Sequence, residues 1–241
     1  MAEHDLIVIG GGTAGLVASA GAAGIGARVA LIEQDRLGGE CLWTGCVPSK
    51  ALIACGRAAH AAGTAGRFGV DVPAATVDFG RVMQWVYDAQ RRIEPHDSPD
   101  RFRSLGVEVI CGTGRFVGER TLRVGSRVVS AKRVVVATGS KPAVPPIYGL
   151  SDVPFLTNET IFSLERQPGT LLVLGAGPIG LELAQAFARL GTTVRVLEAA
   201  PQLLPREDEE LARLLGRHLG AENVEILLDT KVTRVSRDGR T

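Results

Sequence analysis

The hydrophobic residues at the start of the chain follow the order of a strand, a glycine loop, a helix and a second strand. Residues 6–9 form a short apolar run that predicts a strand, and residues 14–24 are small, mostly apolar residues that predict a helix. Residues 28–32 predict a second strand, which ends at Glu33. Strands that alternate with helices are typical of a parallel sheet in an α/β fold.

The same pattern occurs again in the C-terminal half. Residues 171–174 predict a strand, 175–180 a glycine loop, 181–190 a helix and 193–197 another strand. In both units the acidic residue at the end of the second strand lies 23 positions after the first glycine, from Gly10 to Glu33 and from Gly175 to Glu198. Two copies of one design predict two sites of the same kind.

The residues between the two units predict helices followed by short strands. Residues 48–62 and 79–93 are helical in pattern, Asp78 is a plausible N-cap for the second helix, and the prolines at 95–99 should end it. Short β-type runs then cover residues 107–110, 121–124, 127–130 and 133–137. The proline-rich residues 141–146 predict a linker between domains, because proline stops both helices and ladders.

Composition and charge argue against nucleic-acid binding and against a membrane span. The 241 residues are 45% hydrophobic, enough for a sizeable core. Lys and Arg number 27 against 26 acidic residues, and no basic block stands out, so nucleic acid is not an expected partner. No apolar run is long enough to span a membrane, and the start of the chain does not look like a targeting segment. The expected location is the cytoplasm.

Two glycine motifs fit the pattern G-x-G-x-x-G of dinucleotide sites. Their glycines are Gly10, Gly12 and Gly15 in the first unit and Gly175, Gly177 and Gly180 in the second. The first glycine permits a tight turn, the second lets the backbone approach a pyrophosphate, and the third lets helix pack on strand. The helix N-terminus offers free N–H groups to phosphate, and Glu33 or Glu198 can accept hydrogen bonds from ribose hydroxyls. A structural turn is the alternative, but the strand, helix and acidic residue in register favour a nucleotide.

Cys41 and Cys46 form the close cysteine pair of the chain. An ideal helix places Cα atoms five residues apart at about 8–9 Å, whereas a disulfide needs roughly 4.4–6.8 Å. The pair can bridge only if the backbone departs from a regular helix, and Gly45 supplies that freedom. Cys46 lies near the start of the following helix, whose dipole should favour a thiolate.

Two other interpretations of the cysteines are open. The pair could be free buried thiols, or part of a metal or iron–sulfur site, which would need further ligands at suitable spacing. Cys55 and Cys111 do not provide that spacing, so no metal site is expected and these two are expected in the core. In a reducing compartment, a close pair is more often catalytic or metal-binding than structural.

The segment Gly38-Gly39-Glu40-Cys41-Leu42-Trp43-Thr44-Gly45-Cys46-Val47-Pro48-Ser49-Lys50, placed after the first glycine motif, resembles the class I pyridine nucleotide-disulfide oxidoreductases. That family includes dihydrolipoamide dehydrogenase, glutathione reductase and mercuric reductase, and the cysteine segment is most similar to the mercuric reductase and dihydrolipoamide dehydrogenase branch. Residues 135–140 resemble the Ala-Thr-Gly segment that closes the family's first FAD portion. The resemblance covers essentially the whole chain.

The resemblance implies two Rossmann-like dinucleotide-binding domains. The first would be an FAD-binding domain with a β-meander over residues 1–145, and the second an incomplete NAD(P)-binding domain over 146–241. Cys46 would be the thiol nearest the flavin, and Cys41 the thiol that attacks the substrate. Lys50 would lie near the flavin N5 and pair with Glu182, although solvated helix charges are the alternative for both. Further FAD contacts are implied for Gly39, Thr44, Gly114, Thr138 and Gly139.

Glu198 bears on the choice of nucleotide. A carboxylate at this position accepts a hydrogen bond from a ribose 2′-hydroxyl and repels a 2′-phosphate. Members of the family that use NADPH tend to carry arginines just after this strand, whereas residues 199–201 are Ala-Ala-Pro and the next arginine, Arg206, is distant. NADH is therefore favoured over NADPH.

The resemblance also implies parts that residues 1–241 do not contain. These are the rest of the NAD domain beyond a hairpin expected at 232–239, a second FAD portion, and a dimerisation domain with a His–Glu acid–base pair. The full-length form is accordingly expected to be a homodimer. The four histidines, His4, His60, His96 and His218, match no such context and are expected at the surface. The apolar helix face of Ile179, Leu183 and Phe187 is expected to be poorly covered, and residues 1–241 alone are not expected to turn over substrate.

Three functional hypotheses follow. The first is an enzyme that passes electrons from NAD(P)H through FAD to the cysteine pair and on to a disulfide, dithiol or metal-ion substrate. The second is a catalytically incomplete FAD- and NAD-binding fragment. The third is a different flavoprotein, such as a relative of NADH oxidase or ferredoxin reductase, whose chemistry does not need this cysteine pair.

Overall fold

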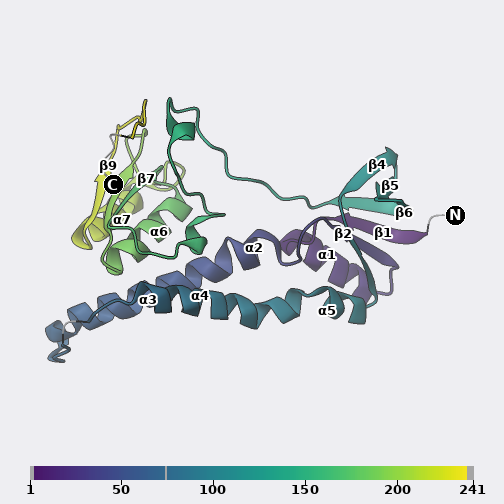
Figure 1. The fold of residues 1–241 in the computed structure, drawn as a ribbon, viewed down its shortest axis with the longest axis horizontal. Helices are drawn as coiled ribbons and strands as arrows, with labels where there is room; N and C mark the ends of the chain where they lie inside the picture. Colours follow the sequence, from purple (N-terminus) through teal and green to yellow (C-terminus); the bar gives the residue numbers. More distant parts are fainter. Residues whose placement is uncertain (1–2, 74, 238–241) are drawn as a thin grey trace. The chain divides into compact units, whose positions relative to one another are not determined.

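The structure is a computed structural model that describes residues 3–73 and 75–237. The chain divides into two compact units. The first unit runs up to Pro48 and includes Asp88–Lys141; the second comprises Ser49–Tyr87 and the residues from Pro142 onward. Each unit contains a sheet with parallel strands (Figure 1) and a glycine loop.

The sheet of the first unit combines a parallel part with an antiparallel meander. Its strands in the described residues are β1 (His4–Ile9), β2 (Val29–Glu33), β3 (Val107–Cys111), β4 (Gly114–Gly118), β5 (Thr121–Val124) and β6 (Arg127–Val136). Their order is β3-β2-β1-β6-β5-β4. β3, β2, β1 and β6 are parallel, while β4, β5 and β6 form the antiparallel meander (Figure 1). This arrangement confirms the predicted α/β class.

The prediction of two separate strands at 127–130 and 133–137 was wrong, because β6 is one strand of ten residues. Its first part pairs antiparallel with β5, from Arg127 opposite Val124 to Ser130 opposite Thr121. From Ala131 onward it pairs in parallel with β1. A strand that changes partners midway has two hydrophobic patterns in succession, and the sequence therefore predicts two strands.

The strands β1 and β2 are packed on both faces, which explains the apolar runs within them. The helices of this unit are α1 (Thr13–Gly24), α2 (Gly39–Trp43), the 3₁₀ turn η2 (Glu94–Asp97) and α5 (Pro99–Ser104). On one face Ile7 and Ile32 pack with Leu122 and Val129 of the meander. On the other face, the neighbouring positions Val8 and Leu31 pack with residues of α1 and α5. Successive residues of a strand thus supply two separate cores.

Two helices of this unit were not predicted. α2 is only five residues long and begins at a glycine with positive φ. α5 follows the prolines that were expected only to end a helix, and Pro99 is its first residue. Proline is well tolerated there because the first turn needs no N–H partner, and the Ser98 hydroxyl caps the helix by accepting from the Arg101 N–H.

The second unit is a three-stranded parallel sheet with helices. Its elements are α3 (Cys46–Thr64), η1 (Ala65–Phe68), α4 (Phe79–Ile93), η3 (Leu150–Asp152), η4 (Ile161–Ser163), β7 (Thr170–Leu174), α6 (Pro178–Arg189), β8 (Thr193–Leu197), α7 (Glu209–Ala221) and β9 (Val224–Leu227). The strand order is β7-β8-β9. The first residues of α3 and the last residues of α4 belong to the first unit. Asp78 caps α4 as predicted, because its Oδ1 accepts from the Arg81 N–H at 3.1 Å.

α6 is the helix on which α3 and α4 pack. The Phe79 ring of α4 lies 6.1 Å from the Phe187 ring, centroid to centroid. A Cβ at Gly56 of α3 would lie 3.1 Å from the Ala186 carbonyl oxygen, so α3 approaches α6 closely. The expectation of a poorly covered face was therefore wrong for Leu183 and Phe187, which are buried. It holds for Ile179, which is 59% exposed.

The predicted hairpin at residues 232–239 is not seen in the part of it that the structure describes. Residues 232–235 form no strand, and Arg234 makes only an isolated parallel bridge to Tyr148. Asp238 and Gly239 lie outside the described residues. Within the described ranges, no helix is long and apolar enough to cross a membrane.

Candidate active site

The first glycine loop joins β1 to α1 through positions that accept no side chain. Gly10 has φ +103°, and a Cβ there would lie 2.2 Å from the Ala137 carbonyl oxygen. A Cβ at Gly15 would lie 1.8 Å from the Gly10 carbonyl oxygen. The Glu33 carboxylate ties this loop to the end of β2, because its Oε2 accepts from the Gly11 N–H at 2.6 Å.

The second glycine loop repeats this geometry between β7 and α6. Gly175 has φ +99°, and a Cβ at Gly180 would lie 2.6 Å from the Gly175 carbonyl oxygen. Glu198 Oε2 accepts from the Ala176 N–H at 2.7 Å, and its Oε1 accepts from the Ala200 N–H at 2.8 Å. The matching carboxylate bonds show that the two units share local structure as well as spacing.

The helices that follow the two loops begin without a side-chain cap. Gly12 is the N-cap of α1 and Gly177 that of α6, and neither helix has a capping hydrogen bond from a side chain among the described residues. By contrast, the Asp208 carboxylate caps α7 through the N–H groups of Glu210 and Leu211. An open first turn leaves N–H groups and the positive end of the helix dipole for another acceptor. Both loops therefore fit the phosphates of a dinucleotide.

The cysteine pair lies where the helix is interrupted, as the disulfide geometry requires. α2 ends at Trp43, Thr44 follows as its C-cap, and α3 begins at Cys46. Gly45 is needed for close approach rather than for a positive φ, because a Cβ there would lie 2.9 Å from the Glu40 carbonyl oxygen. Cys41 is half-buried and Cys46 is exposed.

Cys41 accepts hydrogen bonds at the start of α3, where the sequence predicts that the helix dipole favours a thiolate on Cys46. The adjacent Cys46 thiol and burial raise the pKa of the Cys41 thiol, whereas hydrogen bonds from the Thr13 hydroxyl and the Cys46 N–H lower it. The first N–H of α3 thus supports a thiolate on Cys41. Gly39 makes this arrangement possible, since a Cβ there would lie 2.5 Å from the Gly12 Cα. Two glycines in contact bring α2 and Cys41 beside the first glycine loop.

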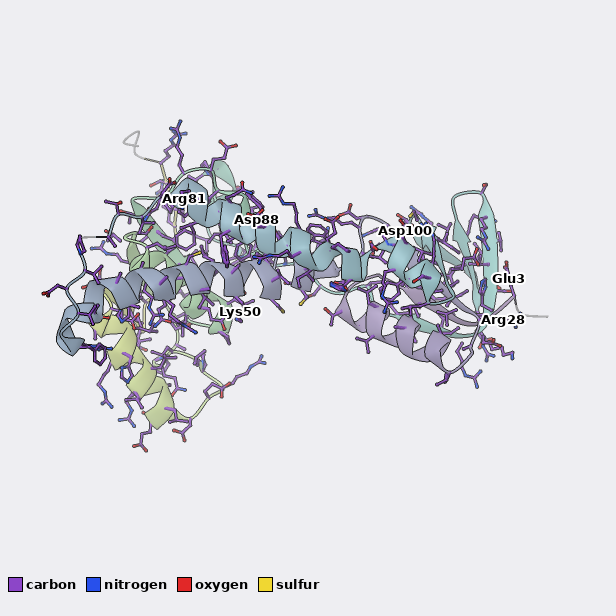
Figure 2. The ribbon with its side chains drawn as sticks, turned by 90° about the horizontal axis from the view of Figure 1, so that it is seen from below. Glu3, Arg28, Lys50, Arg81, Asp88 and Asp100 are labelled. Carbon is purple, nitrogen blue, oxygen red and sulfur yellow. The ribbon has the colours of Figure 1, made fainter. Side chains whose placement is uncertain are left out.

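Lys50 of α3 meets Glu182 of α6. The Lys50 Nζ lies 2.5 Å from the Glu182 Oε2, and both side chains are well exposed. Figure 2 labels Lys50 among the side chains of the ribbon. The structure thus brings together the two charges that the resemblance pairs. Because the pair is exposed, it contributes little to stability, and its role beside a flavin stays a prediction.

The other predicted FAD contacts belong to the first unit. Ala137 directly follows β6, and Thr138 and Gly139 come next, beside the Ala137 carbonyl that lies against Gly10. Gly114 opens β4, where a Cβ would lie 3.3 Å from the Leu122 side chain. Thr44 donates its N–H to the Glu40 carbonyl at 2.9 Å. Their contacts with a cofactor remain predictions.

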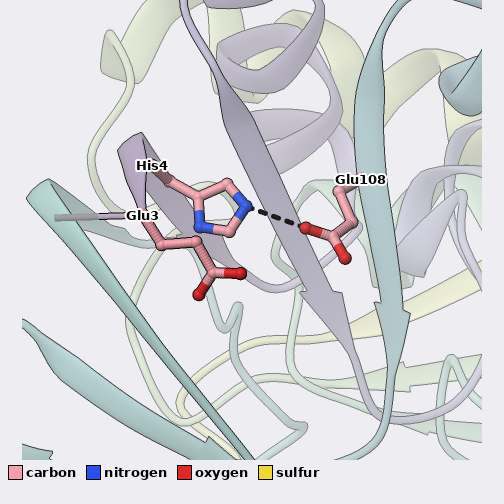
Figure 3. A group of neighbouring side chains, drawn as sticks. All are labelled: Glu3, His4 and Glu108. Atoms are coloured by element: carbon pink, nitrogen blue, oxygen red, sulfur yellow. Dashed lines mark hydrogen bonds and ion pairs between the residues drawn. The ribbon is translucent and has the colours of Figure 1, made fainter.

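The expected surface position of His4 was wrong. His4 is 6% exposed, and its Nε2 bonds the Glu108 Oε2 at 2.8 Å across the sheet (Figure 3). Glu3, His4 and Glu108 could hold a metal ion by their spacing, but the Arg127 guanidinium already bonds both carboxylates. The cluster therefore carries its own cation. His60 is half-buried, while His96 and His218 are exposed as expected.

The expectation that Cys55 and Cys111 are core residues was also wrong. Cys111 ends β3 opposite Glu33 and is exposed, and Cys55 of α3 is only half-buried. Burial raises the pKa of the Cys55 thiol. The apolar pattern of a strand predicts that its middle residues are buried but does not predict the burial of its last residue, which in β3 is the exposed Cys111.

A surface hollow of about 510 Å³ in the second unit lies away from the glycine loop. It is lined by Ala59, Gly63, Ala75, Val77, Gln167, Pro168, Gly169, Arg189, Leu190 and Gly191. These residues include those that precede β7, whereas Gly175 follows it. The Gln167 amide bonds the Leu190 carbonyl, and Arg189 pairs with Glu222. The Gln167 and Arg189 side chains of the hollow are thus engaged within the protein.

Sequence reasoning missed two residues that contact the cysteine segment. Thr13 was only an unspecified position of the glycine motif, and its hydroxyl bonds Cys41. Gln90 of α4 donates its amide to the carbonyls of Leu42 and Trp43, at 3.1 and 2.8 Å. No sequence signal connects Gln90 with a segment almost fifty residues earlier.

Comparison with known families matches residues 4–241 to the pyridine nucleotide-disulphide oxidoreductases. The chain belongs to this family. Among its relatives, a mercuric reductase of Bacillus cereus is 32% identical over 98% of the chain, and a dihydrolipoyl dehydrogenase of Bacillus subtilis is 33% identical over 98%. The solved Cu(II) complex of RclA, an HOCl-induced flavoprotein disulfide reductase of Escherichia coli, is 31% identical over 99% of the chain with a TM-score of 0.83.

Family membership confirms the resemblance and the fold class. The family comprises flavin disulfide oxidoreductases, which use FAD and a pyridine nucleotide, in agreement with two glycine loops of one design. The chain spans only 38% of the length of the B. cereus relative, 53% of the B. subtilis relative and 52% of the E. coli structure.

Proposed function

We propose that the protein is a flavin-dependent disulfide oxidoreductase that takes electrons from NAD(P)H and delivers them through the Cys41–Cys46 pair to a disulfide, dithiol or metal-ion substrate. The observation that carries the proposal is the contact between the two thiols beside the uncapped start of α1. Bound FAD would supply the transfer of an electron pair between nicotinamide and disulfide. The first glycine loop, with Glu33, would hold that cofactor.

The two cysteines would perform thiol–disulfide exchange in two steps. The Cys41 thiolate attacks one sulfur of a substrate disulfide, forms a mixed disulfide and releases the other half of the substrate as a thiolate. The Cys46 thiolate then attacks Cys41, which releases the second half and closes the Cys41–Cys46 disulfide. Two electrons pass from the protein dithiol to the substrate. The pKa of the Cys41 thiol is raised overall by the Cys46 thiol and by burial, and the bonds from Thr13 and from the Cys46 N–H support the first step because they oppose this rise.

The second glycine loop would bind the nicotinamide nucleotide, and we propose NADH over NADPH. Glu198 holds the loop through the Ala176 N–H and keeps lone pairs for a ribose hydroxyl. Its charge would repel a 2′-phosphate. Comparison of kcat/KM for the two nucleotides checks this, and a clear preference for NADPH would contradict it.

Assembly and location are proposed on the same basis. A full-length form would act as a homodimer in the cytoplasm, where the reducing environment keeps a reactive dithiol available. An alternative function, a nucleotide-binding fragment without turnover, is favoured by one observation. Among the described residues, His4 is the buried histidine. It lies at the start of β1 and bonds Glu108 of β3, whereas the glycine loop follows the other end of β1, so His4 is not placed to act as an acid–base group there.

Cysteine variants of the full-length, flavin-loaded protein separate these functions. NADH-dependent reduction is measured with lipoamide, glutathione disulfide and Hg²⁺ as separate acceptors. Cys41→Ser and Cys46→Ser should each lose turnover with the preferred acceptor by at least about 100-fold, because neither can complete the exchange. Cys111→Ser is the matched control and should keep it, since Cys111 is an exposed cysteine of the same unit outside the pair. Full turnover by Cys41→Ser would refute the exchange mechanism.

A further inference from the structure

We infer that Gln90 is a positioning residue for the redox pair, and that it holds the segment between Cys41 and Cys46 in the arrangement that closes their disulfide. The inference deepens the proposed function and rests on it. Gln90 is 6% exposed and lies near the end of α4, in the same compact unit as α2 and both cysteines. Its Nε2 donates to the Leu42 carbonyl at 3.1 Å and to the Trp43 carbonyl at 2.8 Å.

These two carbonyls belong to the last turn of α2. The final carbonyls of a helix have no partner within the helix, and a buried one needs a donor from elsewhere. A helix of five residues also has little stability of its own, so its position depends on the contacts it makes. One amide that bonds two adjacent carbonyls fixes both the end of α2 and the direction in which the chain leaves it.

The helix is interrupted immediately after this clamp. Only Thr44 and Gly45 separate the Trp43 carbonyl from Cys46, which opens α3 and contacts Cys41 through its thiol and its N–H. The Trp43 side chain is held separately, through its Nε1 bond to the Leu37 carbonyl at 2.8 Å. With the backbone of Trp43 fixed by Gln90, the two thiols meet without further ordering of the segment.

The clamp should favour the disulfide over the dithiol. Closing a ring costs less when its ends are already held together, so a fixed segment raises the effective concentration of each thiol at the other. Without the clamp, the dithiol form can open and gain conformational freedom that the disulfide form lacks. Removing the donors of Gln90 should therefore shift the equilibrium towards the dithiol.

The experiment measures this equilibrium in the full-length, flavin-loaded protein with dithiothreitol as the redox partner. Oxidised dithiothreitol accepts two electrons and two protons from the Cys41–Cys46 dithiol and leaves the protein disulfide. After equilibration at a series of ratios, free thiols are trapped with N-ethylmaleimide, and the peptide that contains Cys41 and Cys46 is quantified by mass spectrometry. This readout requires neither NADH nor a substrate.

Gln90→Met keeps the length of the side chain and removes both donors, while Gln90→Glu turns an oxygen towards the two carbonyls. Each should lower the equilibrium constant for disulfide formation about tenfold, which is about 30 mV for a two-electron couple. Gln90→His retains a ring N–H and should recover part of the loss. Val86→Ala is the control, because Val86 is fully buried one turn earlier on α4 but makes no polar contact with the segment.

The outcomes distinguish the inference from the proposed function. An unchanged constant in folded Gln90→Met overturns the inference, and so does a Val86→Ala shift as large as that of Gln90→Met. If Gln90→Met does not fold, the comparison of Gln90→Glu with Gln90→His decides, and equal constants for these two overturn the inference. If wild-type Cys41 and Cys46 form no disulfide at any ratio, the proposed function itself fails.

Discussion

One hydroxyl, that of Thr13, lies between the first glycine loop and the thiol that we expect to attack substrate. It opposes the effects of the Cys46 thiol and of burial, which raise the pKa of Cys41. Thr13→Val keeps the shape of the side chain and removes the donor. We expect alkylation of Cys41 by iodoacetamide in the reduced protein at pH 8 to slow up to about tenfold, because a hydrogen bond to a charged group is worth about 1.5 kcal/mol or more.

The rate at each cysteine is followed by peptide mass spectrometry across a pH series. Thr13→Ser restores the hydroxyl and should restore the rate, whereas Cys111 provides an internal reference, since it is exposed at the end of β3. A Thr13→Val profile that coincides with the wild-type profile for Cys41 would show that the hydroxyl does not act on the thiolate.

Ser19 is a buried residue, and removing its hydroxyl group should stabilise the protein. It lies within α1, is 0% exposed, and its Oγ has no hydrogen-bond partner among residues 3–73 and 75–237. A buried unpaired hydroxyl costs about 1–3 kcal/mol, and alanine is the better helix former. Ser19→Ala should therefore raise the free energy of unfolding in urea by about 1 kcal/mol. Ser98→Ala, which removes the cap of α5, should lower it by about 1 kcal/mol. A loss of stability in Ser19→Ala would mean that the hydroxyl has a partner.

At the scale of elements, a largely buried ion pair joins α6 to the residue that follows α7. Arg189 Nε lies 2.6 Å from the Glu222 Oε2, and Gln185 donates to the same carboxylate. The Arg189 guanidinium lowers the pKa of Glu222. Arg189→Ala should reduce the free energy of unfolding by about 3 kcal/mol at pH 7, because it leaves a carboxylate in a poorly solvated place. Arg213→Ala, which removes an exposed pair with Glu209, should change it by less than about 0.5 kcal/mol.

The same pair predicts a pH dependence. Because the pKa of Glu222 is lower in the folded than in the unfolded protein, its contribution is complete above the ordinary value of 4.5 and is lost as pH falls through the folded value. The stability difference between wild type and Arg189→Ala should therefore narrow when urea unfolding is measured below pH 4. A difference that stays constant from pH 7 to pH 3 would contradict the assignment.

The elements also show where sequence reasoning succeeds and where it stops. β8 and α4 match their predicted bounds because each has a clear period and, for α4, an Asp78 cap. The two glycine loops were predictable because their spacing is local. The burial of His4 was not, because it depends on Glu108, 104 residues away. Likewise, the contacts of Thr13 and Gln90 with the cysteine segment arise from tertiary packing that no local pattern encodes.

At the scale of the whole molecule, the two units repeat one local arrangement, which we propose binds a dinucleotide in each. In each, a carboxylate at the end of the second strand bonds the glycine loop, and the next helix begins uncapped. The first unit alone adds the cysteine segment, at the place where Gly39 meets Gly12. The proposed redox chemistry thus belongs to one copy of the arrangement, while the other unit contains the Lys50–Glu182 pair.

The polypeptide of residues 1–241, produced by itself, should associate and should not turn over substrate. β7 is an edge strand of its sheet in the described residues, and its Leu172 side chain is 57% exposed. Ile179 of α6 is 59% exposed. Open edges with apolar side chains pair with other chains. The acid–base histidine implied by the family resemblance would also be missing, a loss worth roughly 10²–10⁴-fold in rate.

Sedimentation velocity over a range of concentrations tests the association, and an NADH-linked lipoamide assay tests the turnover. Leu172→Lys places a charge on the open strand and should shift the distribution towards monomer, whereas Leu211→Lys, at an exposed position of α7 away from that edge, should not. A wild-type polypeptide that sediments as a monomer at every concentration, with lipoamide turnover that is lost in Cys41→Ser, would show that residues 1–241 carry a complete and self-contained active site.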